Sequence, residues 1–530
     1  MKSKTKNGFK PTEEQLAIYE AVLKGDSVIV RALAGTGKTT TLVTLAERLQ
    51  TESPEKHILY LAFNKSVQLE AERKFPSNVE CRTADSVAWK HPICAPLIAK
   101  SNLSNEHVPD DIIVKKLNIP DITGSSKKRT WKIMGAKRVL GLAKQTVNNF
   151  CISEDEEISE VHLAKLDEKA QKNASQIIGP VLDLALRLWQ DIVTPGGIFP
   201  TTPTHVTKYW ALQNPNLSSD SAGLKHPADV IFFDEAQDVN AVLGKVVADQ
   251  TAQKVIVGDG NQSIYAWRGA VDYLDKVSTD SDLSLTTSFR FGPEIAEASN
   301  KYLRLLGSKH EITGAGPSGF VRWGEKVESA EPDAVIARTN VGAIKAIMDQ
   351  LEKGRSVKIQ ERYSKELRML ISSALWLMGG AKWQTRPSRV HPDLADFKSW
   401  DEVKQAASSG DSHDAKTRML FRMVEEHGIE VLSDVLKKTI TSDSSPWDVE
   451  VLTAHSAKGL EWNHVLIFND FWMPKYRSNR GESVLAAEEV RLAYVAVTRA
   501  KKLLSVGRGG LDWVRKANDE SLLADCAQKA

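Results

Sequence analysis

Residues 32–39, ALAGTGKT, have the types and the spacing that bind the phosphates of a nucleotide. Gly35 and Gly37 allow the backbone to turn its N–H groups toward phosphate oxygens. Lys38 can reach the β- and γ-phosphates, and the hydroxyl of Thr39 can coordinate Mg²⁺. The pattern G-x-x-x-x-G-K-[ST] describes this segment, although its first glycine is an alanine here. An ordinary glycine-rich turn between a strand and a helix is the alternative interpretation.

Two carboxylates follow an apolar run in residues 230–238, VIFFDEAQD. The run predicts a buried strand that ends in acids at the carboxyl edge of a parallel sheet, where ligands bind in open α/β sheets. Asp234 would hold Mg²⁺, directly or through water, and Glu235 would orient and deprotonate an attacking water. A strand end capped by solvated acids is the alternative. The two segments together favour a nucleoside triphosphatase.

The elements that must position these residues alternate between strand and helix. Residues 11–24 predict a helix with acids in its first turn, and 39–50 predict a second helix. The apolar, β-branched runs at 27–31 and 57–62 predict strands. Further strands are expected at 230–233, 255–257, 334–337, 449–452 and 465–468. This alternation indicates an α/β fold with parallel, doubly wound sheets.

The alternation is interrupted twice by helical, charged stretches, which indicates two core domains that each carry an insertion. We expect the first core at residues 1–90 and 226–288 around an insertion at 91–225, and the second core at 289–345 and 447–530 around an insertion at 346–446.

The composition excludes several classes of protein. Of 530 residues, 42% are hydrophobic and 26% charged, which argues against a mainly disordered, collagen-like or membrane-embedded chain. The net charge of +2 excludes a bulk polycation but leaves room for a local basic groove. The four cysteines form no CxxC pair, and no apolar stretch approaches the roughly 20 residues that cross a bilayer. We expect a protein of the reducing cell interior without a membrane partner, cytoplasmic or, in a eukaryote, nuclear.

Eight segments in order along the chain resemble the motifs of superfamily 1 DNA helicases of the UvrD/Rep type. The resemblance is strongest to the helicase core of the F-box DNA helicase family, without a recognisable F-box. The segments are ALAGTGKT, AFNKS (62–66), RTADSVA (82–88), DEAQD (234–238), VGDGNQSIYAWRGA (257–270), LTTSFRFGPEI (285–295), LTAHSAKGLEW (452–462) and EEVRLAYVAVTRAKK (488–502). The resemblance implies two RecA-like P-loop NTPase core domains, each with a mainly helical insertion.

The resemblance also implies ATP and Mg²⁺ as cofactors. Gln15 matches the glutamine that reads the adenine edge, and Phe289 is placed to stack on adenine. Arg499 resembles an arginine finger supplied by the second core domain. The alternative for Arg499 is a surface arginine, and the alternative for Phe289 is a core aromatic. The expected nucleotide contacts are Gln15, Ala34, Gly35, Thr36, Gly37, Lys38, Thr39, Thr40, Phe289 and Glu461, the last near the ribose. The expected catalytic residues are Lys38, Asp234, Glu235, Gln262 as γ-phosphate sensor, Arg290 at the phosphates, and Arg499, with Thr39 and Asp234 at the metal.

Three aromatic residues are expected to stack on DNA bases: Phe63, Tyr265 and Trp267. Stacking on aromatic faces contributes about 1–3 kcal/mol per base without sequence preference. Trp267 follows the segment of Gln262 closely, which would connect base stacking to the nucleotide; a core tryptophan is the alternative. The other expected DNA contacts are Asn64, Thr83, Arg268, Thr453 and His455.

The function that the resemblance implies is an ATP-dependent motor that moves 3′→5′ on single-stranded DNA and unwinds duplex. Its partners would be single-stranded DNA and junctions between single and double strands. The alternative is a DNA-stimulated ATPase that remodels nucleoprotein complexes, or the motor subunit of a larger complex with weak unwinding. Repair, recombination, replication and defence all stay open as the pathway, as does the identity of any protein partner.

Overall fold

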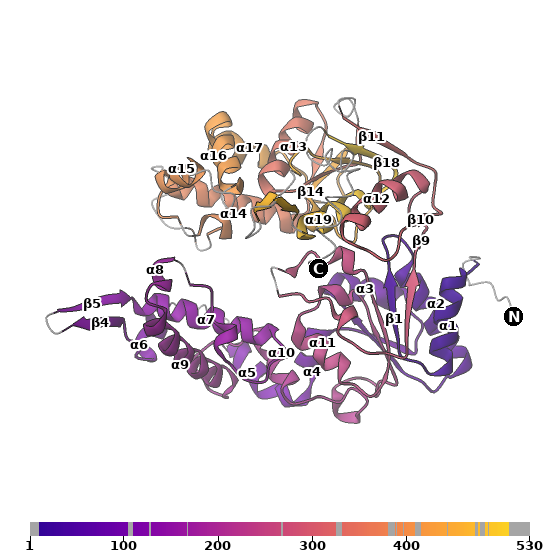
Figure 1. Ribbon diagram of the computed structural model, residues 1–530, viewed down its shortest axis with the longest axis horizontal. Helices are drawn as coiled ribbons and strands as arrows, with labels where there is room; N and C mark the ends of the chain where they lie inside the picture. Colours follow the sequence, from indigo (N-terminus) through magenta and orange to yellow (C-terminus); the bar gives the residue numbers. More distant parts are fainter. Residues whose placement is uncertain are drawn as a thin grey trace. The chain divides into compact units, whose positions relative to one another are not determined.

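The computed structural model describes most of the chain, in two compact units (Figure 1). One unit comprises Met1–Ala32 and Gly37–Leu285, and the other Leu33–Thr36 and Thr286–Ala530. The described residues are 10–103, 110–126, 129–166, 168–266, 269–324, 331–379, 387, 390–395, 397–408, 415–442, 444–471, 475–477, 483–485 and 487–507. No helix among them is long and apolar enough to cross a membrane.

A six-stranded parallel sheet in the order β3-β2-β6-β7-β1-β8 forms the centre of the first unit. Alternate residues of its strands enter two separate apolar cores, so Ile29 packs on one face and Val28 and Val30 on the other. Burial on both faces explains the continuous apolar runs in the sequence. The strands are β1 (Val28–Ala32), β2 (Ile58–Ala62), β3 (Val79–Thr83), β6 (Val230–Phe233), β7 (Gln253–Gly258) and β8 (Ser281–Leu285).

The helices of this sheet begin with residues that suit a helix start. Thr12 and Gln15 form a capping box at the first helix, since each side chain accepts a hydrogen bond from the other's backbone N–H. Asn64 caps a later helix by accepting from the N–H of Val67. The helices that pack on the sheet are α1 (Glu13–Lys24), α2 (Lys38–Glu52), α3 (Lys65–Lys74) and α11 (Ala241–Ala248).

A mainly helical segment lies between β3 and β6 and has its own apolar core. It also contains an antiparallel hairpin, β4 (Ile122–Ser126) with β5 (Arg129–Met134), which the sequence analysis did not predict. The hairpin lies at the far end of this segment in Figure 1. The helices are α4 (Ala84–Lys90), α5 (Ala95–Leu103), α6 (Asp110–Lys116), α7 (Ala136–Ile152), α8 (Glu168–Gln171), α9 (Ala174–Val193) and α10 (Pro203–Ala211).

The second unit is built on another six-stranded parallel sheet, in the order β11-β18-β15-β12-β14-β13. Its strands are β11 (Phe320–Trp323), β12 (Ala334–Ala337), β13 (Val357–Lys358), β14 (Val449–Thr453), β15 (Trp462–Ile467) and β18 (Ala500–Val506). Two short pairs accompany it, β9 (Thr287–Ser288) with β10 (Thr313–Gly314), and β16 (Lys475–Arg477) with β17 (Ser483–Leu485).

Helices cover this sheet and also fill the stretch between β13 and β14. The first group is α12 (Pro293–Leu305), α13 (Asn340–Glu352), α18 (Ala454–Ala457) and α19 (Ala487–Val497). The second is α14 (Glu361–Leu377), α15 (Trp400–Ser408), α16 (Ala415–His427) and α17 (Ile429–Lys437). The prediction of an α/β fold with parallel sheets is confirmed.

Candidate functional site

The glycine-rich loop that joins β1 to α2 has the backbone that its sequence predicts. Gly35 and Gly37 have φ angles of 75° and 80°, in the left-handed region that residues other than glycine rarely adopt. The hydroxyl of Thr36 donates to the carbonyl of Leu33 at 2.8 Å, which closes the turn. A Cβ added at Gly35 would lie 2.5 Å from the Oγ of Ser288, so the position also lacks room for a side chain.

Lys38 begins α2 and extends to the acids that follow β6. Its Nζ lies 2.9 Å from Oε1 of Glu235, and its side chain is 16% exposed. Burial by itself would lower the pKa of Lys38, but the negative charges of Glu235, Asp234 and Asp259 outweigh it and raise that pKa. The amine therefore stays protonated and is held at the carboxyl edge of the sheet.

Asp234 and Glu235 follow β6 and have different hydrogen-bond partners. Asp234 is buried and accepts hydrogen bonds from the hydroxyl of Tyr60 at 2.7 Å and from the N–H of Glu235 at 2.9 Å. Burial, followed by the charge of Glu235, raises the pKa of Asp234. Glu235 has a φ of 55°, a left-handed conformation that costs a non-glycine residue about 1–3 kcal/mol. Strain of this kind persists where the surroundings hold the side chain in one place.

Gln237 helps to hold Glu235 in place, a role that its sequence context does not predict. It is fully buried, and its Nε2 donates to Oε2 of Glu235 and, at 3.3 Å, to Asp238. Its Oε1 accepts from the backbone N–H of Asp259 at 3.0 Å. Both ends of the amide are thus engaged, and the side chain connects the end of β6 to the end of β7. Nothing in the spacing of DEAQD distinguishes this glutamine from a solvated one.

Gln262 and Tyr60 complete the buried polar groups at this edge. Gln262 is buried and donates from Nε2 to Oδ2 of Asp259 at 2.7 Å. The ring of Tyr60 belongs to the apolar core of β2, while its hydroxyl reaches Asp234. Burial, followed by the charge of Asp234, raises the pKa of Tyr60, so it remains a hydrogen-bond donor. A tyrosine in an apolar strand is too common in sequences to have predicted this contact.

The oxygen donors near Lys38 suit Mg²⁺. Magnesium in proteins usually binds through one or two carboxylates together with substrate phosphates and water. Asp234 provides a buried carboxylate and Thr39 a half-buried hydroxyl, both hard oxygen donors of that kind. Among the described residues no three His, Cys, Asp or Glu side chains group to hold a metal by themselves.

The remaining expected nucleotide contacts of the first unit differ in accessibility. Gln15 is buried, and its amide donates to Thr41 Oγ1 at 3.0 Å and accepts from the N–H of Thr12 at 3.1 Å. Thr40 is exposed on the first turn of α2. Gln15 therefore stabilises the start of α1 in this structure and is closed to solvent, whereas Thr40 is open to solvent.

Several residues expected at the nucleotide lie in the second unit, which includes residues 33–36. Phe289 is 39% exposed, so the alternative of a core aromatic is wrong. The N–H of Ala34 donates to the hydroxyl of Tyr494 at 3.2 Å, a partner that the sequence did not indicate. Arg290 donates from Nε to Glu461 Oε2 at 2.7 Å. These contacts order the loop at residues 33–36 and pair two of the expected residues with each other.

Arg499 is buried, with 2% of its surface exposed, so the alternative of a surface arginine is also wrong. Its guanidinium donates to the carbonyl of Val495 at 2.8 Å, to that of Leu460 at 3.3 Å and to the hydroxyl of Thr498 at 3.0 Å. These bonds hold the side chain in one orientation. Such an orientation is a requirement for an arginine that acts in a reaction.

A cavity of about 190 Å³ gathers three of the residues expected to contact DNA: Phe63, Thr83 and Tyr265. The rings of Phe63 and Tyr265 stack, with centroids 5.9 Å apart and an angle of 17°. Phe63 is 38% exposed. Asp234 also lines this cavity, so one carboxylate lies both beside Lys38 and beside the aromatic pair.

The other expected DNA contacts are distributed over several helix starts. Asn64 and Thr83 use their side-chain oxygens to cap α3 and α4. Thr453, buried at the start of α18, lies 3.2 Å from the hydroxyl of Ser456, and His455 is half-buried. Trp267 and Arg268 lie outside the described residues.

Comparison with known proteins identifies relatives along almost the whole chain. The family described as "UvrD-like helicase C-terminal domain" matches residues 125–507. F-box DNA helicase protein 1 of Schizosaccharomyces pombe is 30% identical over 93% of this chain and 57% of its own length, and F-box DNA helicase 1 of Gallus gallus is 29% identical over 93% and 48%. The probable DNA helicase II homolog of Mycoplasma genitalium is 22% identical over 92% and 83%. The chain thus spans about half the length of the two F-box relatives.

Proposed function

Since the chain belongs to the family of UvrD-like helicases, we propose that it is an ATP-dependent DNA helicase that moves 3′→5′ on single-stranded DNA. The observation that carries the proposal is the position of Asp234. It lies beside Lys38 and Glu235 on one side, and it lines the cavity of Phe63 and Tyr265 on the other. A motor needs a nucleotide site and a DNA grip that share structural parts, because the nucleotide must bias how DNA is held.

The two parallel sheets support an assignment as two RecA-like P-loop NTPase domains. The first would comprise residues 1–90 and 226–288, with the insertion 91–225 that includes the hairpin β4–β5. The second would comprise 289–345 and 447–530, with the insertion 346–446. The paired strands of each sheet support this division, except that β13 (Val357–Lys358) pairs with β14 in the second sheet although it lies within the proposed insertion 346–446.

Phosphate binding would begin at the loop and at Lys38. The left-handed backbones of Gly35 and Gly37 suit N–H groups that face phosphate oxygens. Lys38 would exchange Glu235 for the β- and γ-phosphates, which are the stronger anions. Thr39 and Asp234 would hold Mg²⁺, which neutralises phosphate charge when bound. Ala34 and Thr36 would complete the contacts around the phosphates, and Thr40 would lie beside the base.

The exchange at Lys38 would give Glu235 its catalytic role. Once Lys38 faces phosphate, Oε1 of Glu235 is available to orient water, while Oε2 stays bound to Gln237. We assign Glu235 as the general base on this ground. Gln262, fixed to Asp259, would sense the γ-phosphate.

Further residues would bind the adenine, the ribose and the phosphates of ATP. The exposed ring of Phe289 suits stacking on adenine, with Gln15 at the base edge and Glu461 near the ribose. Arg290 would meet the phosphates, and the fixed guanidinium of Arg499 suits an arginine finger. Such a residue accelerates phosphoryl transfer by about 10³–10⁵ in related enzymes.

Single-stranded DNA would enter over the aromatic cavity. Bases would stack on Phe63 and Tyr265, and on Trp267, while Asn64, Thr83, Arg268, Thr453 and His455 would contact the backbone. Junctions between single and double strands are the proposed substrates. The protein would act inside the cell on DNA, in the cytoplasm or, in a eukaryote, in the nucleus.

Directional unwinding tests the proposal. The purified chain is given ATP, Mg²⁺ and a duplex that carries either a 3′ or a 5′ single-stranded tail, and strand separation is followed by fluorescence. We expect separation with the 3′ tail alone. Separation with the 5′ tail alone would contradict the polarity. ATP hydrolysis stimulated by DNA without separation of either substrate would favour the remodelling ATPase instead.

A further inference from the structure

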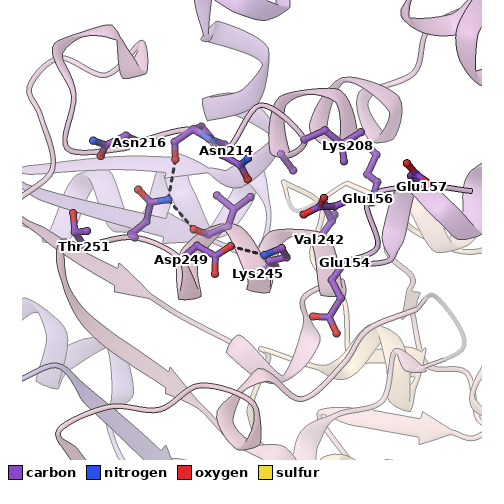
Figure 2. Close-up of a pocket in the computed structure, with 15 residues that line it drawn as sticks. Glu154, Glu156, Glu157, Lys208, Asn214, Asn216, Val242, Lys245, Asp249 and Thr251 are labelled. Carbon is purple, nitrogen blue, oxygen red and sulfur yellow. Dashed lines mark hydrogen bonds and ion pairs between the residues drawn. The ribbon is translucent and has the colours of Figure 1, made fainter.

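A larger cavity in the first unit is lined by none of the residues assigned to the proposed motor (Figure 2). Its volume is about 540 Å³, within the range of roughly 300–1,000 Å³ that ligand sites occupy. One side of the cavity is formed by α10 and the segment that follows α10, and the other side by α11. Three acids of the loop 153–157, which follows α7, line it as well.

Lys208 of α10 ties this acidic loop to the cavity wall. Its Nζ donates to the carbonyls of Ser153 at 2.9 Å and Asp155 at 2.5 Å, and it lies 4.1 Å from the ring centroid of Phe150. The side chain of Lys208 is almost fully buried. Its charge is therefore directed into the wall, where backbone oxygens and the aromatic ring face it.

Gln250 holds the opposite wall. Its Nε2 donates to the carbonyls of Pro215 at 2.9 Å and Val246 at 2.8 Å, and its Oε1 accepts from the N–H of Leu217 at 2.8 Å. The buried amide thus binds the segment after α10 to α11. The two walls are held by bonds within the protein, so the cavity is a built feature of the fold.

The lining combines an apolar part with a negative rim. Leu212, Val242 and Val246 supply apolar surface. Glu156 and Glu157 are exposed on the rim. Glu154 also lines the cavity and accepts hydrogen bonds from Tyr273 and Lys276. Asp249 forms an ion pair with Lys245 at 2.7 Å, and a dashed line marks this pair in Figure 2. The other charged residue of the lining is the buried Lys208. Carboxylates thus outnumber ammonium groups, and the rim would repel the phosphates of DNA.

We propose that this cavity is a docking site for a partner protein that inserts a lysine or arginine side chain beside an aliphatic one. The cation would lie at Glu156 and Glu157, and the aliphatic chain would cover Val242 and Val246. Charge complementarity selects a basic segment over an acidic or phosphorylated one.

The position of the cavity suggests what such a partner would do. α10 and α11 line this cavity with Lys208 and Val242, and they line the aromatic cavity of Phe63 with Thr207 and Leu243. A partner would therefore press on the same two helices that border the proposed DNA grip. This consequence rests on the proposed function, whereas the docking itself does not.

Methyl NMR of the whole chain tests the docking. The protein, with ¹³C-labelled leucine and valine methyl groups, is titrated with the acetylated and amidated heptapeptide Gly-Leu-Arg-Leu-Arg-Leu-Gly. We expect the signals of Leu212, Val242 and Val246 to move with added peptide. A heptapeptide with glutamate in place of both arginines should leave them in place. Equal movement with the acidic peptide, or none with the basic one, would overturn the proposal.

Charge variants provide the matched control. The double substitution Glu156→Gln and Glu157→Gln should raise the dissociation constant of the basic peptide about threefold to tenfold, as expected for two exposed ion pairs. Glu160→Gln, in the same acidic region but outside the lining, should leave it unchanged. An equal loss in both variants would contradict the site. ATP hydrolysis is measured separately, so failure of the docking proposal and failure of the proposed helicase function can be told apart.

Discussion

The ion pair between Lys38 and Glu235 joins two groups that the proposed reaction needs apart. Lys38 must face phosphate while Glu235 faces water. Phosphate binding at Lys38 would release the carboxylate, so the base becomes available only with substrate present. Meanwhile the hydroxyl of Tyr60 stays bound to Asp234, and the amide of Gln237 stays bound to the other carboxylate oxygen of Glu235.

Removal of the amine should abolish the reaction. Lys38→Ala deletes the cation that reaches the phosphates, and we expect ATP hydrolysis to fall to background in a colorimetric phosphate assay. Lys74→Ala, at an exposed position of α3, is the control and should hydrolyse ATP normally. Turnover that DNA still stimulates in Lys38→Ala would remove Lys38 from the site. Circular dichroism checks that both variants are folded.

Gln237 should act by holding Glu235, not by touching ATP. Gln237→Leu removes a hydrogen bond to a charged group, an interaction of about 1.5–3 kcal/mol, so kcat should fall about tenfold to a hundredfold. The KM for ATP should stay near its original value. Gln213→Leu, at an exposed position, serves as the control. A rise in KM with unchanged kcat would mark Gln237 as a binding residue instead.

Strands were the most predictable elements, because parallel strands buried on both faces leave an unbroken apolar run in the sequence. The expected strands at 230–233 and 334–337 have the bounds of β6 and β12. The roles of Tyr60 and Gln237 were not predictable, since each depends on a partner that only the folded sheet brings near. The local patterns specify each strand but not which strand becomes its neighbour.

The hairpin β4–β5 was missed because its strands carry few apolar residues and show no clear alternation. The strands pair antiparallel, and the ring of Trp131 lies over Gly124 of the opposite strand. A Cβ at Gly124 would come within 2.6 Å of that ring. Only the pairing register reveals why a glycine stands there.

That contact predicts opposite effects for two glycine substitutions in the same insertion. Gly124→Ala should lower the free energy of unfolding by about 1–3 kcal/mol, because the ring must move. Gly141→Ala, in α7 where a Cβ would meet nothing within 4 Å, should raise it by about 0.5–1 kcal/mol. Urea unfolding of both variants measures the difference. Equal effects would show that the ring and the glycine do not pack as described.

Over the whole molecule, the near-neutral net charge conceals an acidic surface. The net charge is +2, yet the cavity beside the loop 153–157 is rimmed by carboxylates. DNA binding at the aromatic cavity and protein docking at the acidic one would thus be separated by position. α10 and α11 border both.

Coupling between DNA and ATP should depend on the aromatic pair. Phe63→Ala removes a stacking surface worth about 1–3 kcal/mol, so the affinity for single-stranded DNA should fall roughly 5–150-fold. Basal hydrolysis should persist, because Lys38, Asp234 and Glu235 are retained. Leu69→Ala, an exposed apolar residue of α3, is the control for both measurements. Loss of basal hydrolysis together with a lower melting temperature would indicate a structural role for Phe63.

ATP hydrolysis by the purified chain, with and without single-stranded DNA, tests the central claim most directly when the original protein is compared with Glu235→Gln. The amide keeps the size of the side chain and removes the base. We predict that DNA strongly stimulates hydrolysis by the original protein, and that Glu235→Gln still binds ATP and DNA but hydrolyses ATP very slowly. Hydrolysis that ignores DNA, or that continues near its original rate in Glu235→Gln, would contradict a DNA motor driven from this site.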